Sequence, residues 1–381
     1  MNKLVSMLAV APLIAGATEY YADPAKGNDA NDGRSAATAF RTLERATRGL
    51  KAGDALNLSA GAVFAESLVL RASGTAERPI LVRGNGAVVS GAHPIDPAKW
   101  ESRGDGLWFQ PSDRCWGALR PRVYIGDEMI SPACGHPNKV DPKELSPRTA
   151  IWQTKGIYFR AEAGKTPRDY ALLGGAGRSK GEHSGVIIED RSYITVENLV
   201  AERFPNDGFN VHGTCRGILF LNIVARQNGD DGFSIHDDVM ATVIGLHSHH
   251  NDFGIQDVGV SQTIVSGAVL EENRLAGFDV YGGIRILRDA TVRGNGGRQI
   301  RISPTLDRNR KLVSPMGATT AYLENVRVEG GAGEPLRVED GVTVTAKGCT
   351  FAACGAPAFV SPKATFAQDG CTGIDKRGAQ K

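Results

Sequence analysis

The chain has 381 residues, of which 44 are basic and 42 acidic, giving a formal net charge of +2. This balance, with no run of Lys or Arg, excludes a protein that binds nucleic acid through a basic surface. The length supports a sizeable buried core. The 47 glycines are spread along the chain and indicate a fold with many tight turns.

The N-terminal residues MNKLVSMLAVAPLIAGATEYY combine an early lysine, an apolar stretch and small residues at Ala15, Gly16 and Ala17. This pattern is typical of a secretory signal peptide. We therefore predict a signal peptide over 1–18 and a mature domain over 19–381. No other stretch approaches the roughly 18 apolar residues of a membrane helix, so we expect a secreted or periplasmic protein with no membrane span.

Six cysteines can form disulfides after export, and they allow 15 complete pairings. We assign none and expect some of them to be buried as small hydrophobic residues. They are Cys115, Cys134, Cys215, Cys349, Cys354 and Cys371.

The segment TAFRTLERATRGL, residues 38–50, has helical spacing and predicts a helix that caps one end of the domain. Residues 111–183 break the repeat described next. We predict that they form an irregular loop insertion of the kind that walls a groove.

A repeat occupies the middle of the chain. Gly208, Gly232, Gly254 and Gly277 each precede Phe or Ile and lie 24, 22 and 23 residues apart. Each follows a polar turn and a short apolar run, and a period near 23 is typical of a solenoid. Leucine-rich repeats have a similar length, but their consensus and a helical period are missing. The repeat predicts an all-β parallel β-helix whose coils bury their apolar faces by stacking.

Strand alternation assigns the side chains of two coils to opposite faces. Four apolar residues are expected to point inward: Phe209, Val211, Phe233 and Ile235. Four polar residues are expected to point outward: Asn210, His212, Ser234 and His236. Stacked coils lie about 4.8 Å apart, so His212 and His236 should be neighbours. The outward ladder continues through Gln256, Val258, Asp279 and Tyr281.

Carboxylates gather just before the repeated glycines, at Asp207, Asp230 and Asp231. Asp before Gly is an ordinary turn former. Acids that adjoin across neighbouring coils nevertheless repel unless a cation or a shared proton relieves them. The group therefore predicts turn residues that also act in acid–base catalysis or hold Ca²⁺, and the metal is left open.

The segments YYADPAKGNDANDGRSAATAFRTLERA, LKAGDALNLSAGAVFAESLVL and SGTAERPILVRG resemble the opening of secreted right-handed β-helix proteins of the pectate-lyase-like superfamily. The resemblance covers residues 20 to about 90 well and the repeats to 360 in general. It implies a single-stranded right-handed parallel β-helix that acts on a polysaccharide. It does not choose among lyase, hydrolase and epimerase.

The order Asp207, Asp230–Asp231, Phe253-Gly254-Ile255 and Arg285-Ile286 resembles the motif order of polygalacturonase-type hydrolases. This resemblance implies that Asp207 is the general acid, that Asp230 and Asp231 activate water, and that Arg285 binds a substrate carboxylate. The chain departs from that pattern at Phe253, where the family has His, and at Leu287, where it has Lys.

The phrase GFSIHDD is similar to the Gly-x-Asp-Pro-His-Asp motif of mannuronan C5-epimerases and matches it at Gly232, His236 and Asp237. It departs from the motif at Ser234 and Ile235. The similarity implies that His236 is a catalytic base or acid that Asp237 orients, with His212 or Tyr281 as its opposite partner.

From these patterns we predict an enzyme that cleaves a uronate-containing polysaccharide by β-elimination or acid-pair hydrolysis. Asp279, Tyr281 and Arg285 are expected to bind the substrate. A C5-epimerase and a non-catalytic glycan-binding protein remain alternatives. The stretch HSHHN, residues 247–251, is either a polar loop or a zinc site. We expect a monomer with no nucleic-acid partner.

Overall fold

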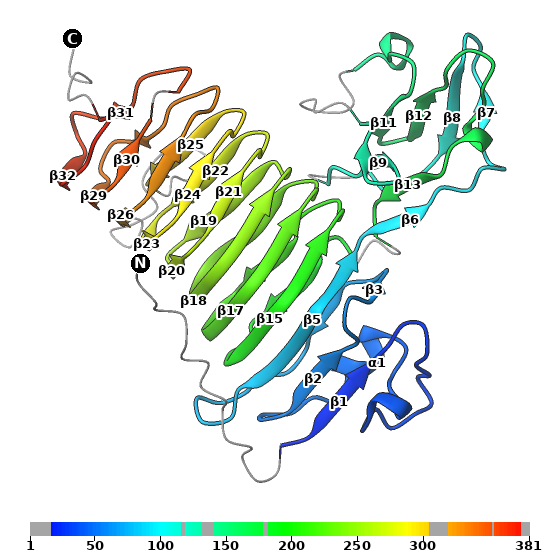
Figure 1. Ribbon diagram of the computed structural model, residues 1–381, viewed down its shortest axis with the longest axis horizontal. Helices are drawn as coiled ribbons and strands as arrows, with labels where there is room; N and C mark the ends of the chain where they lie inside the picture. The colour runs from blue at the N-terminus through cyan, green and yellow to red at the C-terminus, as the bar shows by residue number, and fades with distance from the viewer. Residues whose placement is uncertain are drawn as a thin grey trace, which may run out of the picture.

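The computed structural model describes residues 17–115, 119–131, 140–177, 182–304, 319–352 and 354–374. Most of the expected signal peptide, residues 1–16, lies outside this set, as does Cys134. The described residues form a rod of stacked coils with an additional lobe at one side (Figure 1). The prediction of an all-β parallel β-helix is confirmed, because the 24 strands of the main sheet system are hydrogen-bonded side by side and their pairings are parallel.

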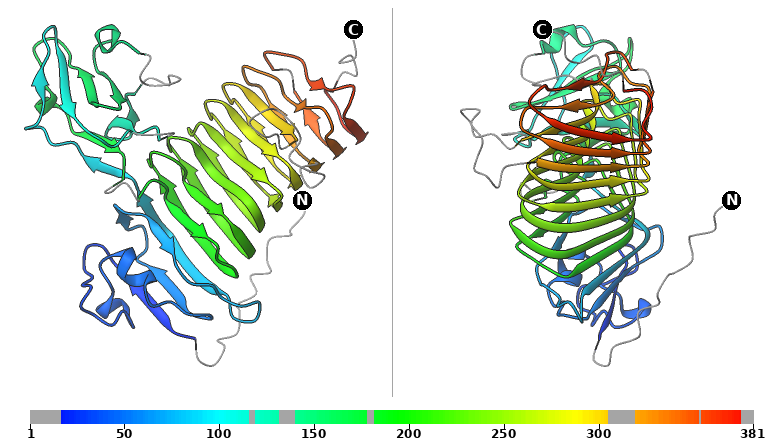
Figure 2. Two further views of the ribbon diagram at one scale, coloured as in Figure 1. Left: turned by 180° about the vertical axis from the view of Figure 1, so that it is seen from behind. Right: turned by 90° about the vertical axis from the view of Figure 1, so that its left-hand side faces the viewer.

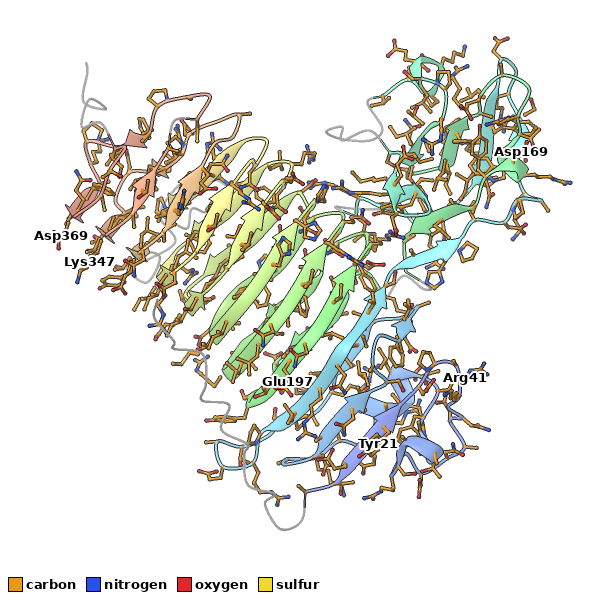
Figure 3. The ribbon with its side chains drawn as sticks, in the orientation of Figure 1. Tyr21, Arg41, Asp169, Glu197, Lys347 and Asp369 are labelled. Atoms are coloured by element: carbon orange, nitrogen blue, oxygen red, sulfur yellow. The ribbon has the colours of Figure 1, made fainter. Side chains whose placement is uncertain are left out.

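Each coil contributes strand segments to three faces of the rod, and the two views in Figure 2 show the coils stacked along one axis. The first face contains β1 (Glu19–Ala22), β2 (Ala55–Leu58), β5 (Ile80–Ser90), β15 (Ile194–Glu202), β17 (Thr214–Arg226), the middle of β18 (Asp231–His249), β20 (Gln262–Ser266), β23 (Gly283–Arg288), β26 (Thr319–Glu324), β29 (Thr343–Lys347) and β32 (Thr365–Asp369). At the C-terminal end of this face, Lys347 and Asp369 are register partners in β29 and β32 (Figure 3).

The second face contains β3 (Val63–Phe64), the C-terminal parts of β5, β15, β17 and β18, then β21 (Val269–Glu271), β24 (Thr291–Arg293), β27 (Arg327–Glu329) and β30 (Thr350–Phe351). The third face contains β4 (Leu68–Leu70), β14 (Val186–Glu189), β16 (Phe209–His212), the start of β18, β19 (Phe253–Gly259), β22 (Ala276–Tyr281), β25 (Arg298–Ser303), β28 (Arg337–Val338) and β31 (Phe359–Val360).

The interior of the rod is filled as strand alternation predicts. Phe209, Val211, Phe233 and Ile235 are fully buried. The rings of Phe209 and Phe233 stack at 6.0 Å between centroids, and Phe220 meets Phe233 edge-on at 4.9 Å. Offset and edge-to-face aromatic pairs of this kind stabilise a core beyond the area they bury. The core therefore fixes which side chains of each coil face outward.

A ladder of buried asparagines forms the turn between the second and third faces. Asn228, Asn251, Asn273 and Asn295 are fully buried. The Nδ2 group of each of the first three donates a hydrogen bond to the Oδ1 of the asparagine in the next coil. Their Nδ2 groups also donate to backbone carbonyls such as that of Ala225. Because a buried polar group needs a partner, this ladder is structural, and it holds the acids beside it at one turn.

The inserted lobe begins earlier than predicted and is more regular than expected for residues 111–183. It consists of two four-stranded antiparallel sheets and rises from the rod next to β5 (Figure 1). One sheet contains β6 (Ala92–Pro94), β9 (Arg122–Ile125), β10 (Glu128–Met129) and β13 (Leu172–Gly175); the other contains β7 (Glu101–Ser102), β8 (Leu107–Pro111), β11 (Thr149–Gln153) and β12 (Gly156–Arg160). Its own apolar cluster, which includes Trp100 and Phe159, explains why it does not follow the coil period.

The predicted helix over 38–50 is present but shorter. Helix α1 spans Leu43–Thr47, is capped by the Thr42 side chain, and packs Leu43 and Ala46 into the rod core. Short 3-10 turns lie at Ala36–Thr38, Pro142–Glu144 and Pro167–Asp169.

Five of the six cysteines lie in the described part of the chain, and each is a free thiol there. Cys115, Cys215 and Cys349 are buried, as expected for small hydrophobic residues. Within the described residues, no helix has the length and apolar character needed to cross a membrane.

Candidate functional site

Three carboxylates converge on the outside of the rod, at the turn where the second face passes into the third. Asp207, Asp230 and Asp231 each place an oxygen within 4.8 Å of the others. Asp207 precedes β16, and Asp231 begins β18 in the next coil, so stacking brings together residues that are 24 positions apart. The structure therefore brings the three sequence-predicted acids into one group, which we call the acid cluster.

Asp207 is buried and held by neighbouring polar groups. Its Oδ2 accepts hydrogen bonds from the Nδ2 groups of Asn206, at 2.7 Å, and Asn210, and its Oδ1 accepts one from the backbone N–H of Asp231 at 3.3 Å. Burial raises the pKa of Asp207 to about 7, and the charge of Asp230 contributes to the rise. The turn thus holds a carboxyl group that titrates near neutrality.

Asp231 is buried beside it. Burial, followed by the charges of Asp207 and Asp230, raises the pKa of Asp231 well above its ordinary value. Its Oδ2 accepts a hydrogen bond from Ser234, but among the described residues no hydrogen bond reaches its Oδ1. The Oδ1 of buried Asn210 is likewise without a partner within the described part. These two buried oxygens are therefore available to accept a hydrogen bond or to coordinate a cation.

Asp230 is half-buried and connects the acid cluster to the inserted lobe. Its Oδ1 lies 2.9 Å from Arg120 Nη1, and the same guanidinium contacts Asp252. Burial raises the pKa of Asp230 even though Arg120 opposes the rise. The lobe therefore supplies a positive charge at the outer edge of the acid cluster.

Asp252 occupies the corresponding turn of the following coil, where it binds Arg120 and Arg122 of the lobe. Arg122 and Arg274 both pair with its Oδ atoms, at 2.7 and 2.5 Å. Burial acts to raise the pKa of Asp252, but the guanidinium groups of Arg274, Arg122 and Arg120 lower it below its ordinary value. Asp252 is thus a permanently charged structural group.

Ser234 links the acid cluster to a histidine. Its hydroxyl donates to Asp231 Oδ2 at 2.7 Å and lies 3.0 Å from His236 Nε2. Burial lowers the pKa of His236, so the imidazole is neutral near pH 7. His212 and His236 follow the register partners Val211 and Ile235, so they are neighbours on adjacent coils as predicted.

Asp237 does not orient His236, contrary to the sequence interpretation. It is exposed, has a left-handed backbone with φ of 70°, and accepts a hydrogen bond from the backbone N–H of Gly213 at 3.0 Å. The left-handed conformation turns its side chain toward the previous coil. Ser234 has the hydrogen bond to the imidazole that was expected of Asp237.

Asp279 and Tyr281 lie on the same face, further toward the C-terminus. Asp279 is buried and forms a two-point ion pair with Arg301, at 2.6 and 2.5 Å, while the Tyr281 hydroxyl donates to it at 3.2 Å. Asp279 and Arg301 line a pocket of about 440 Å³ together with Phe253, Arg298 and Glu334. Of the predicted substrate-binding residues, Asp279 therefore lines a pocket on this face, and Tyr281 contacts Asp279 through a hydrogen bond.

Arg285 is not a groove residue, and its assignment to substrate binding is corrected here. The residue is fully buried inside the rod, where its Nη2 lies 2.9 Å from Asp257 Oδ1. Thr263 donates to the same aspartate at 2.6 Å. Arg285 aligns with inward-facing Thr263 in the register of β20 and β23, so alternation sends its side chain into the interior.

The sequence interpretation missed several polar residues of this surface. Arg120 and Arg122 come from the lobe, and nothing in the repeat period connects them with Asp230 or Asp252. Ser184, whose hydroxyl lies 3.5 Å from Asp207 Oδ2, precedes the first complete repeat. Arg301 could have been found, because it is the register partner of Asp279 one coil later.

The residues of the acid cluster fit a Ca²⁺ ion. Ca²⁺ binds six to eight oxygens at about 2.3–2.6 Å, so oxygens on opposite sides of the ion are about 4.6–5.2 Å apart. One oxygen of each carboxylate lies within 4.8 Å of the others, which is close enough for all three to reach one ion. At this site, Asn210 Oδ1 and Asp231 Oδ1 are buried oxygens that have no hydrogen-bond partner among the described residues. Asp207, Asp230 and Asp231, with Asn210, are the residues that would hold the ion.

Comparison with known proteins defines the class of fold. Residues 184–312 match the family model described as the right handed beta helix region. The structure is similar to XylC in complex with xylose, with a TM-score of 0.56, 12% identity and coverage of 93% of this chain and 68% of that one. It is also similar to pectate lyase Pel9A, with a TM-score of 0.55, 13% identity and coverage of 97% and 82%.

At these identities the likeness to solved structures establishes the fold. The chain is a right-handed parallel β-helix protein, and the resemblance seen in its sequence is confirmed at that level. No curated protein matches the sequence.

Proposed function

We propose that this protein is a secreted or periplasmic carbohydrate-active enzyme that cleaves a uronate-containing polysaccharide by β-elimination, with Ca²⁺ held by Asp207, Asp230 and Asp231. The observation that carries the proposal is the convergence of the three carboxylates within 4.8 Å, two of them buried and one with an oxygen that lacks a partner in the described part of the chain. Like charges so close need a cation or protons.

The same spacing favours elimination over inverting hydrolysis. Inverting enzymes keep their two carboxyl groups about 6.5–9.5 Å apart to leave room for water. Oxygens that approach within 4.8 Å leave no such gap. Asp207, Asp230 and Asp231 would instead hold a metal ion, which would supply positive charge for the carboxylate of a uronate.

A bound Ca²⁺ ion would supply positive charge beside the substrate carboxylate and so make the proton on the adjacent carbon more acidic. His236 is the proposed base, because burial keeps its imidazole neutral. When Ser234 donates to ionised Asp231, the serine oxygen accepts from His236 Nε2–H, which leaves Nδ1 free to take a proton. As the C–H electron pair forms the C=C bond, the bond to the glycosidic oxygen breaks and that oxygen takes a proton from solvent.

The pocket beside Asp279 is the proposed site for a further sugar unit. Phe253 offers a ring surface, and the ion pairs Asp279–Arg301 and Arg298–Glu334 offer donors and acceptors for hydroxyl groups. Apolar walls with a few placed polar groups are typical of small-ligand sites.

A second candidate is acid-pair hydrolysis with Asp207 as general acid. The observation that favours it is the pKa of Asp207, which burial raises to about 7 and which suits a proton donor near neutral pH. In the hydrolytic reaction Asp230 or Asp231 would activate water.

Product analysis separates the candidates. We would incubate the protein with pectate, alginate and a glycosaminoglycan, with Ca²⁺ or with EDTA, and measure absorbance near 235 nm, reducing ends and proton exchange with solvent. An unsaturated product that requires Ca²⁺ supports elimination. Reducing ends without unsaturation support hydrolysis, and exchange without cleavage supports a C5-epimerase. Binding without any reaction supports the glycan-binding alternative.

Variants then test the assigned residues. Asp231→Asn should abolish Ca²⁺-dependent cleavage, and His236→Gln should lower kcat with little change in Ca²⁺ affinity. Asp289→Asn, which changes a carboxylate outside the acid cluster, is the matched control. Full activity in His236→Gln would exclude the imidazole as the base.

A further inference from the structure

A second group of potential metal ligands lies on the second face of the rod, and it shares no residue with the acid cluster. It consists of His247, His249 and His250, near the C-terminal end of β18. The rings of His247 and His249 lie 4.5 Å apart, and those of His249 and His250 lie 5.0 Å apart. The Nδ1 atoms of His249 and His250 lie 2.8 Å apart and share a hydrogen bond, in which one ring donates and the other accepts.

Two carboxylates from the next coil hold the outer nitrogens of this group. His247 Nε2 lies 2.7 Å from Glu271 Oε1, and His250 Nε2 lies 3.1 Å from Glu272 Oε2. A neutral imidazole that donates from Nε2 to a carboxylate has its lone pair at Nδ1. Histidines that bind metals usually have this arrangement, because the carboxylate fixes the tautomer and raises the basicity of the ligand nitrogen.

The backbone explains why two consecutive side chains converge. His250 has a left-handed conformation, with φ of 59°, so its side chain turns to the same side as that of His249. Gln227 and Glu272 are also left-handed at the corresponding turns of the neighbouring coils, with φ of 58° and 53°. The left-handed conformation therefore belongs to this turn in each of these coils, whatever residue occupies it. Of the coils that the structure describes, only that of His249 and His250 places two histidines there.

The surroundings of His249 keep its imidazole in the neutral form near pH 7. Burial, together with the neighbouring His247, His250 and Arg226, lowers the pKa of His249 to about 4. Arg226 is itself paired with Glu202 at 2.7 Å, and Arg293 is paired with Glu271 at 2.6 Å. The two arginines therefore have acidic partners of their own, and Glu272 adds negative charge beside the histidines.

We propose that His249 and His250 form a binding site for one divalent transition-metal ion such as Zn²⁺ or Ni²⁺, with the two Nδ1 atoms as protein ligands and water in the remaining positions. With metal–nitrogen bonds of about 2.0–2.1 Å, two ligand nitrogens lie about 2.9 Å apart at a right angle, the geometry common for Ni²⁺, and about 3.3 Å apart at the tetrahedral angle of Zn²⁺. The separation of 2.8 Å observed here is close to the first value and would widen by about half an ångström on binding Zn²⁺. Imidazole nitrogen is a ligand for Zn²⁺, Ni²⁺ and Cu²⁺, whereas the oxygen-only acid cluster suits Ca²⁺.

The test is isothermal titration of the full, tag-free protein with ZnCl₂ and with NiCl₂. The variants are His249→Gln/His250→Asn, in which Asn tolerates the left-handed backbone, and Glu272→Gln. We expect one saturable equivalent in the wild type, its loss in the double variant, and about tenfold or greater weakening in Glu272→Gln. His93→Gln, which removes a histidine from the lobe, should bind as the wild type does.

Asp231→Asn separates this site from the acid cluster, because it should leave zinc and nickel binding intact. Circular dichroism and thermal unfolding of each variant would show that the fold is retained. The inference is overturned if the wild type binds neither metal, or if the double variant binds with the wild-type stoichiometry and affinity.

Discussion

The Ser234 hydroxyl donates a hydrogen bond of 2.7 Å to the carboxylate of Asp231, and this contact couples the acid cluster to an imidazole. A hydroxyl has one proton to donate. When this proton is hydrogen-bonded to Asp231, the serine oxygen can only accept a hydrogen bond from His236 Nε2, which lies 3.0 Å away. The charge of one buried carboxylate therefore decides which nitrogen of His236 is free.

Removal of that hydroxyl should reveal the coupling. In Ser234→Ala, buried Asp231 loses its hydrogen-bond donor, so its pKa should rise further and Ca²⁺ affinity should fall. We expect a loss of stability of about 1–3 kcal/mol near pH 7 and a shift of the activity profile toward higher pH. Urea unfolding and pH–rate profiles measure the two effects. Ser234→Thr retains the hydroxyl, so its stability and pH profile should be close to those of the wild type. An unchanged pH profile in Ser234→Ala would contradict the coupling.

In the metal-free protein, the contribution of Asp207 to stability should fall as the pH rises from about 4 to about 7. The pKa of Asp207 is about 7 in the folded state and 3.8 unperturbed, so the folded state binds its proton more tightly. The stability that Asp207 contributes is therefore fully present below its unfolded pKa. It is lost as the pH rises through its folded pKa, by a few kcal/mol in total. Thermal unfolding in EDTA between pH 4 and pH 8 tests this expectation.

Two comparisons accompany that measurement. Asp207→Asn should flatten the pH dependence, because the titrating group is gone. Ca²⁺ should restore stability most strongly at pH 8, the upper end of this range, where the acid cluster carries the most negative charge. The same pH dependence of stability in Asp207→Asn and in the wild type would contradict the assignment of Asp207.

The asparagine ladder should be critical for stability. Asn251→Ala removes the amide that donates to Ala225 O and accepts from Asn228, leaving several buried groups unpaired. We expect a loss on the order of 3 kcal/mol in the free energy of unfolding, because each orphaned group costs about 1–3 kcal/mol. Gln262→Ala, an exposed amide on the first face, should change the stability by less than about 0.5 kcal/mol. Equal effects would mean that the ladder is dispensable.

The interior position of Arg285 predicts a stability defect. Arg285→Met leaves Asp257 buried without its cation, which should cost about 3–5 kcal/mol. Asp257→Asn combined with Arg285→Met should recover most of that loss in urea unfolding. Activity per folded molecule should not change, whereas Arg301→Met, at the outer pocket, should raise KM. A raised KM with normal stability in Arg285→Met would contradict the interior assignment and would indicate that Arg285 binds the substrate.

Much of the fold is determined by local pattern. The 22- to 24-residue spacing of Gly208, Gly232, Gly254 and Gly277 identifies the coil, and alternation in GFNVH and GFSIH correctly assigns Phe209 and Phe233 to the core. Both follow from short-range rules, since turn residues and a two-residue strand period are local properties. The grouping of Asp207 with Asp231 also follows, because residues one period apart are adjacent in stacked coils.

The lobe and the individual partners were decided by tertiary structure. Arg120 reaches Asp230 across 110 residues, and Arg122 reaches Asp252 across 130, with no period to connect them. Arg285 resembled a groove residue in its motif but pairs inside the rod with Asp257. Asp237 was assigned to His236, which Ser234 contacts instead.

The sequence by itself determined the coil, its inward residues and the turn where the acids meet, because these depend on spacing along one chain. Only the tertiary structure decided which of those acids are buried, which oxygens remain without partners in the described part, and which arginines neutralise them. Burial and charge pairing depend on every group that surrounds a carboxylate in space, and most of those groups come from other coils or from the lobe.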